Sequence, residues 1–187
     1  MKTSRFIVIC FFIVWGVLSR TIFHLGPNIE FITGISIACG ILIRNRKIAL
    51  LIPILIMLIS DMVIGNTKIF LFTWSAFLIP VLIGFFLLKL FRKSSENKYL
   101  KIFVFSELSA VISSLSFFVW TNFGHWLITN MYTKDLNGFI SCYINAIPFL
   151  KPQLAGNLII VPIFIISAYL IFNYSSNNNW KLSDSSK

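Results

Sequence analysis

The chain has 187 residues, of which 57% are hydrophobic and 12% are charged, and its formal net charge is +10 at pH 7. A soluble domain carries about 25% charged residues, so this composition, with a mean hydropathy of +0.86, excludes an ordinary water-soluble fold. The basic residues stand in short runs between apolar stretches, as they do in cytoplasmic membrane loops, which argues against a nucleic-acid-binding protein. We therefore expect one all-α integral membrane bundle that contacts the lipid bilayer.

Six apolar stretches are candidates for membrane-spanning helices, which need about 20 mostly apolar residues. We expect them at about 6–23, 27–43, 48–64, 69–88, 102–120 and 158–174. The second stretch is unusual because Pro27, Asn28 and Glu30 occupy its first turn, where polar groups are poorly placed against lipid. This end is expected to rest against other protein segments or a watery cavity.

The basic residues predict the orientation of the chain. With six spans, twelve of them fall on one side: Lys2, Arg5, Arg44, Arg46, Lys47, Lys89, Arg92, Lys93, Lys98, Lys101, Lys181 and Lys187. The other side holds four: Arg20, Lys68, Lys134 and Lys151. Because cytoplasmic loops carry the excess of Lys and Arg, we expect both termini in the cytoplasm and the protein in the cell (inner) membrane.

The outer connection 121–157 is too long for an ordinary turn. Between 136 and 148 its apolar residues recur at helical spacing: Leu136, Phe139, Ile140, Tyr143, Ile144 and Ile147. This pattern predicts a short amphipathic helix that ends near Pro148 and lies on the outer surface or over the mouth of the bundle. The polar tail 175–187 is predicted to be disordered.

Polar and aromatic groups gather at the outer membrane level, where ionisable side chains carry information because they are costly in lipid. They are Arg20, His24, Glu30, Asp61, Asn122, His125 and Trp126. We interpret the group as the lining of a binding pocket, with Arg20 and Asp61 as a possible ion pair. The alternative is that these are the polar and aromatic residues ordinarily found at a membrane–water interface. Arg20 would then extend its charged end to the headgroups, and Trp126 would belong to the aromatic belt.

Two further features leave alternatives open. Glu107 lies roughly 9 Å into the fifth span from the cytoplasmic side. A basic partner or a proton path would explain a carboxylate at this depth. The rest of the inner half is apolar, which disfavours a proton-driven carrier.

Gly34 and Ala38 form a small-xxx-small pair, which is typical of packing within a bundle and also of docking onto a partner.

Signatures of catalysis are missing from the sequence. There is no HExxH, GxSxG, P-loop or aspartate-rich run, and Cys10, Cys39 and Cys142 form no CxxC pair. We expect no enzyme, no metal site and no cofactor.

Several motifs together resemble an uncharacterised bacterial membrane family, over about 20–157. They are Arg20 with His24-Leu25-Gly26-Pro27-Asn28, Ser60-Asp61 with Gly65, Thr121-Asn122-Phe123-Gly124-x-Trp126, Tyr132, Gly138, Cys142-Tyr143 and Ala146-Ile147-Pro148-Phe149. That family looks like the substrate-binding S components of energy-coupling factor transporters. Such components are six-helix bundles with both ends inside, which bind a vitamin or metal near the outer face and dock onto a transmembrane coupling subunit that joins two ATPases.

The resemblance implies substrate capture for a micronutrient transporter. The residues expected to line the outer pocket are Arg20, His24, Asn28, Asp61, Asn122 and Trp126. Arg20 would hold a carboxylate or phosphate and Trp126 would stack on a ring, with the 136–148 helix as a lid and Gly34 and Ala38 as the docking surface. The alternatives are a structural or assembly membrane protein without a ligand and an autonomous ion-coupled carrier.

Overall fold

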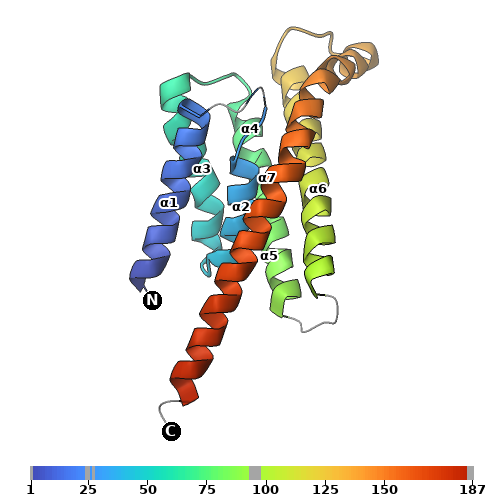
Figure 1. Cartoon of the computed structure of the whole chain (residues 1–187). Helices are drawn as coiled ribbons and strands as arrows, with labels where there is room; N and C mark the ends of the chain where they lie inside the picture. The colour runs from blue at the N-terminus through green and yellow to red at the C-terminus, as the bar shows by residue number, and fades with distance from the viewer. Residues whose placement is uncertain (1, 24–25, 27, 93–97, 185–187) are drawn as a thin grey trace.

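The computed structural model describes residues 2–23, 26, 28–92 and 98–184, and all regular structure within these ranges is helical. The helices are α1 (Lys2–Thr21), α2 (Ile32–Leu42), α3 (Arg46–Ile64), α4 (Phe70–Ala76), α5 (Leu78–Arg92), α6 (Lys98–Ile128) and α7 (Leu136–Asp184). They form an elongated bundle in which α1 begins and α7 ends at the same end (Figure 1). We call this the terminal end; the opposite, loop end carries 28–31, 65–69 and 129–135.

Four stretches of the described chain are long and apolar enough to cross a membrane. They are α3, the pair α4–α5 (Phe70–Arg92), α6 from Tyr99, and α7 as far as Tyr174. The apolar parts of α1 (Phe6–Thr21) and α2 are shorter. The prediction of an all-helical membrane protein is confirmed, whereas six crossings and their orientation stay predictions.

The central helix is α2, which packs against α3, α5 and α7. Every residue from Ile32 to Ile41 is buried. At its closest approach to α5, Gly40 faces Gly84, and a Cβ on either glycine would collide with backbone of the other helix, at the carbonyl oxygens of Val81 and Ile37. The two helices therefore touch backbone to backbone, a contact that only small residues permit.

The helix α2 is shorter than the predicted 27–43 span. It begins at Ile32, and the described residues 28–31 before it are not part of the helix. Asn28 has φ 59°, in the left-handed region that Asn adopts more readily than most residues and that a right-handed helix does not contain. Eleven residues of helix are about 16 Å long, roughly half the hydrocarbon core of a bilayer. The loop end of the bundle thus has no central helix.

The pair α4–α5 breaks for one residue at Phe77. Pro80 explains the break, because it offers no N–H to the carbonyl of Ala76, where α4 ends, and its ring crowds that carbonyl. The break places Phe77 at the level of the N-terminus of α2, since Phe77 and Thr33 line the same recess.

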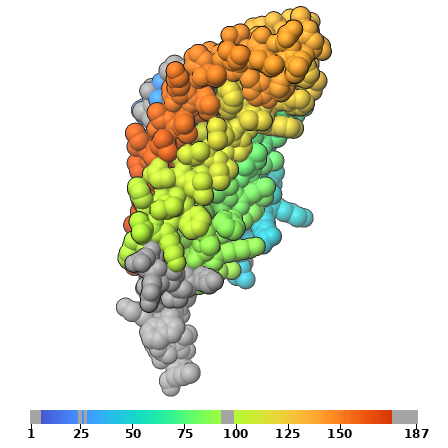
Figure 2. Space-filling view, turned by 90° about the vertical axis from the view of Figure 1, so that its right-hand side faces the viewer, coloured from blue at the N-terminus to red at the C-terminus, as the bar shows by residue number. Residues whose placement is uncertain are grey.

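The connection 121–157 is not a loop, which corrects the prediction. The helix α6 runs on to Ile128, and α7 begins at Leu136 and continues through Pro148, Pro152 and Pro162. Only 129–135 is a turn, so the end of α6 and the first part of α7 form a helical hairpin, which we call the hairpin (about 119–148). The hairpin makes up the top of the molecule in Figure 2. The predicted 136–148 helix is the first part of α7 and does not end at Pro148.

The C-terminal tail also differs from the expectation of disorder. The backbone of α7 is helical as far as Asp184, so the helix includes the first ten residues of the predicted tail, and 185–187 lie outside the described residues. The polar composition of 175–187 suggested disorder because such a segment has little apolar surface to bury.

Candidate binding site

A cavity of about 460 Å³ opens at the loop end, in the space that α2 does not reach. This volume lies within the ~300–1,000 Å³ typical of small-molecule sites. Its walls come from α1, the 28–30 segment, α3, α4, α6 and α7. The polar residues that line it are Arg20, Asn28, Glu30, Asp61, Thr67, Thr73, Thr121, Asn122 and Gln153.

An ion pair joins two walls of the cavity. Arg20, in the last turn of α1, donates from Nη1 to Asp61 Oδ1 at 2.7 Å and to Ser60 Oγ at 2.8 Å. Trp74 Nε1 donates to the other carboxylate oxygen of Asp61 at 2.8 Å. The predicted Arg20–Asp61 pair is confirmed. Both carboxylate oxygens of Asp61 accept a hydrogen bond, which offsets the cost of burying the charge.

Glu30 is the second carboxylate near Arg20, and it lies farther from the guanidinium than Asp61 does. The distance from Arg20 Nε to Glu30 Oε2 is 3.7 Å, too long for a hydrogen bond. The side chain of Glu30 is 35% exposed, against 8% for Asp61. Glu30 is thus the carboxylate that is more open to an incoming molecule.

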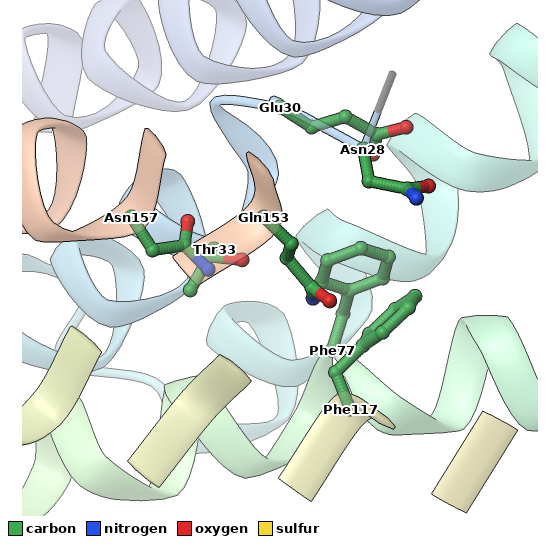
Figure 3. A pocket seen from close by; sticks show the side chains of 7 residues that line it. All are labelled: Asn28, Glu30, Thr33, Phe77, Phe117, Gln153 and Asn157. Carbon is green, nitrogen blue, oxygen red and sulfur yellow. The ribbon is translucent and has the colours of Figure 1, made fainter. Parts of the chain in front are cut away.

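A smaller recess of about 30 Å³ adjoins the cavity and shares Asn28, Glu30, Phe77, Phe117 and Gln153 with it. This volume is enough for a water-sized group. Figure 3 shows Glu30 and Asn28 on one side of the recess and the carboxamide of Gln153 pointing towards the rings of Phe77 and Phe117. The two ring centroids are 5.1 Å apart.

The floor of the recess is polar although it lies deep in the bundle. Thr33 and Asn157 complete its lining, and both are buried. Asn157 Nδ2 donates to Ser114 Oγ of α6 at 2.9 Å, which fixes the carboxamide. Gln153 and Asn157 are four residues apart on α7 and therefore share one helical face.

Four of the six predicted pocket residues line the cavity: Arg20, Asn28, Asp61 and Asn122. The amides of Asn28 and Asn122 bond to backbone, at Phe149 O (3.4 Å) and Phe118 O (2.8 Å). His24 lies outside the described residues.

Trp126 does not line the cavity, which corrects its predicted place. It lies one helical turn beyond Asn122, about 6 Å farther along α6, and belongs to the hairpin. Its Nε1 donates to Thr133 O at 3.0 Å, and its ring packs edge-on against Phe139 at 5.3 Å. Trp126 thus ties the two arms of the hairpin together, and this contact occupies its N–H.

The hairpin accounts structurally for several of the motif residues. Tyr143 donates from its hydroxyl to Val119 O at 2.8 Å, and Asn145 Nδ2 donates to the hydroxyl of Tyr132 at 3.3 Å. A Cβ at Gly138 would collide with Thr133 O. The first part of α7 is therefore packed along α6 and forms a wall of the cavity, which Ala146, Phe149 and Leu150 line.

Gly34 and Ala38 do not form a docking surface, which corrects that prediction. Both are buried inside the bundle, and a Cβ on Gly34 would meet the ring of Phe164 of α7. The alternative interpretation, packing within the bundle, is the one that the contacts support.

Sequence reasoning missed Thr33, Phe77, Phe117, Gln153 and Asn157. A signal was present for the last two, because two carboxamides one helical turn apart interrupt an apolar run. It is missed because the predicted helix ends near Pro148, which leaves Gln153 and Asn157 in an irregular segment without a helical face.

Comparisons with known proteins assign the chain to a family whose function is unknown. A family of unknown function, DUF6580, matches residues 1–179 of the chain. The comparison with curated proteins finds no match, and neither does the comparison with solved structures. The resemblance to S components stays a prediction.

Proposed function

We propose that this chain, which belongs to DUF6580, a family of unknown function, is the substrate-capturing membrane subunit of an uptake transporter for a vitamin-like micronutrient. The observation that carries the proposal is the 460 Å³ cavity, open at the end of the bundle opposite both termini. Polar groups in a membrane bundle are costly unless they bond to one another or line a wet space. Here they do both.

The proposal includes six crossings with both termini in the cytoplasm. The basic residues of the sequence support it, because twelve of the sixteen fall on the terminal end in this arrangement. The cavity then opens to the outside, where a nutrient arrives. The half-height α2 is compatible with a crossing, because its polar lead-in residues Asn28 and Glu30 face the cavity and not lipid.

A transmembrane coupling subunit and ATPases would supply the energy. The proposal needs a partner because the sequence has no P-loop. Recovery of ATPase subunits with the chain from its native membrane would support this part. The alternative, a structural membrane protein, predicts an outer polar cluster that is packed solid; the open cavity favours capture.

Binding by purified protein tests the capture hypothesis. We expect one member of a vitamin panel to raise the melting temperature of the wild-type chain and of Ile144→Phe, but not of Ala146→Phe. Ala146 lines the cavity, so a phenyl ring there fills it, whereas Ile144 is exposed two residues earlier on the same helix. Equal binding by both variants, or no binding by well-folded wild-type protein, would contradict capture in this cavity.

Labelling tests the orientation. In a chain whose native cysteines are replaced by alanine, Asn66→Cys should react with a membrane-impermeant maleimide on intact cells, because Asn66 lies exposed in the 65–69 segment. Arg44→Cys, exposed at the turn between α2 and α3, should react only after permeabilisation. The reverse pattern would put the cavity on the cytoplasmic side.

A further inference from the structure

We infer that the molecule captured in the cavity is uncharged and places a hydroxyl group in the small recess that Thr33 and Gln153 line. The inference rests on the proposed function and adds the chemical class of the substrate, an alcohol whose apolar body occupies the larger cavity. It differs from the expectation that Arg20 holds a carboxylate or phosphate.

The recess contains polar groups that the bundle itself does not satisfy. Thr33 is more than nine-tenths buried, at 6% exposure, and it lines the recess. Within the described part of the chain, neither its hydroxyl nor the carboxamide of Gln153 has a hydrogen-bond partner. Asn157, by contrast, is held through Nδ2, which donates to Ser114 Oγ. Buried polar groups are nearly always hydrogen-bonded, so the hydroxyl of Thr33 indicates that a further molecule bonds to it in the recess.

The first turn of α2 adds donors to this side of the recess. The N–H groups at the start of a helix have no partner within the helix, and Phe31, the residue before α2, makes no side-chain cap. Thr33 belongs to this first turn. The recess therefore offers donors at the helix start and acceptors in the oxygens of Thr33 and Gln153. A hydroxyl is a small group that both accepts and donates, so it can use both kinds.

The charged residues of the lining do not require a charged ligand, because they are engaged with one another. Arg20 lies 2.7 Å from Asp61 and 3.7 Å from Glu30. A carboxylate or phosphate in the recess would lie beside Glu30, a like charge, and an ammonium would compete with Arg20 for the same carboxylate. An uncharged hydroxyl leaves these ion pairs as they are.

The size of the recess and its aromatic wall narrow the class further. About 30 Å³ holds a group of the size of water, which fits a hydroxyl and is too small for a phosphate. The rings of Phe77 and Phe117 form the apolar wall of the recess, with centroids 5.1 Å apart (Figure 3). Phe118 and Phe149 line the larger cavity. An apolar ligand body can therefore pack on these rings while its hydroxyl reaches the polar side of the recess.

A matched set of probes tests the inference on purified full-length protein. The probes are 2-phenylethanol, its methyl ether, phenethylammonium and 3-phenylpropanoate, which share a ring and differ at the end that would enter the recess. Specific binding is the part that is lost in Ala146→Phe, whose cavity is filled. We expect the alcohol to bind about fivefold or more tightly than the ether, from one or two net hydrogen bonds, and also more tightly than both charged probes.

Two outcomes would overturn the inference while leaving capture intact. An ether that binds as tightly as the alcohol would show that the recess holds only a water molecule. A charged probe that binds as tightly as the alcohol would show that the ligand is not selected for being uncharged.

Removal of one hydroxyl locates the preference. Thr33→Val keeps the shape of the side chain, and it should bring the affinities of the alcohol and the ether to within about twofold of each other. Thr21→Val makes the same change outside the cavity lining, where the hydroxyl donates to Val17 O within α1 at 2.9 Å, and it should keep the preference. Gln153→Met removes the second polar group and gives the same readout if Thr33→Val does not fold. An unchanged preference in the folded variants would contradict the recess as the hydroxyl site.

The failure of this inference can be told apart from the failure of capture. If no probe shifts the melting temperature of folded wild-type protein at about 10 mM, ten times a dissociation constant that is already weak, the inference is wrong. The vitamin panel with Ala146→Phe then decides on capture separately.

Discussion

The two ends of the bundle are built on different principles. Near the terminal end, α2 and α5 meet backbone to backbone at Gly40 and Gly84, around apolar side chains such as Ile37 and Leu87. Near the loop end, α2 is absent, and charged and amide groups surround a cavity of about 460 Å³. The difference shows how a small membrane bundle makes room for a cavity: it shortens its central helix and leaves the outer helices in place.

The largest expected effect is the loss of one partner of the ion pair at the loop end. Arg20→Met leaves Asp61 with an uncompensated charge at 8% exposure, and breaking a buried pair in this way costs about 3–5 kcal/mol. We expect a strongly lowered melting temperature, measured by scanning fluorimetry in detergent.

The exchange of the two charges provides the control. Arg20→Asp and Asp61→Arg together should be more stable than either single change, because opposite charges face each other again. A double variant no better than the worse single one would show that the pair contributes nothing through its charge.

The terminal end is tested by overpacking. Gly40→Ala puts a methyl group against the carbonyl oxygen of Val81 and the Cα of Gly84, so the two helices have to move apart. Overpacking costs about 1–3 kcal/mol, and we expect a lower melting temperature. Ser36→Ala, on the same helix, serves as the matched control. A Gly40→Ala variant with an unchanged melting temperature would contradict the close contact between the helices.

A smaller effect of opposite sign is expected at Ser36. Its hydroxyl oxygen is buried and lacks a hydrogen-bond partner within the described part of the chain. Removing an unsatisfied polar group is nearly neutral or stabilising, by up to about 1 kcal/mol. The melting temperature of Ser36→Ala should therefore equal or exceed that of the wild type, and a clear decrease would mean that the hydroxyl is satisfied in the membrane.

The smallest effect concerns the hairpin turn. The backbone N–H of Gly138 and the hydroxyl of Thr133 bond to the carboxylate of Asp135 and lower its pKa. A lowered pKa in the folded state stabilises the turn above the unfolded pKa of about 3.9, and this is lost as the pH falls through the lower folded value. Trp126 fluorescence should change below about pH 4 in the wild type and show no such transition in Asp135→Asn.

Some of the structure follows from local sequence. Asn45 caps α3 by accepting hydrogen bonds from the N–H groups of Lys47 and Ile48, a start signal that lies in the local sequence. The predicted 48–64 span accordingly differs from α3 by only two residues. The short apolar run after Glu30 predicted an interrupted second span, and the interruption is where the cavity lies. The Arg20–Asp61 pair followed from the cost of isolated charges in a membrane.

Other parts depend on contacts between distant segments. Pro148 and Pro152 normally end a helix, but packing of α7 against α6 keeps it continuous, through contacts such as Asn157 to Ser114. The extension of α6 to Ile128 carries Trp126 away from the cavity, and the continuity of α7 brings Gln153 into it. Local spacing contains no information on which side of a long helix another helix lies.

The Arg20–Asp61 pair also closes one side of the cavity. The helix α1 packs mainly on α3, and the ion pair joins the two helices at the level of the cavity, above the contact of Gly16 with Ile56. Losing one partner of a buried pair costs about 3–5 kcal/mol, so the two helices have a strong reason to stay together here. If the proposed capture is correct, a solute would therefore enter through the open loop end and not sideways between α1 and α3.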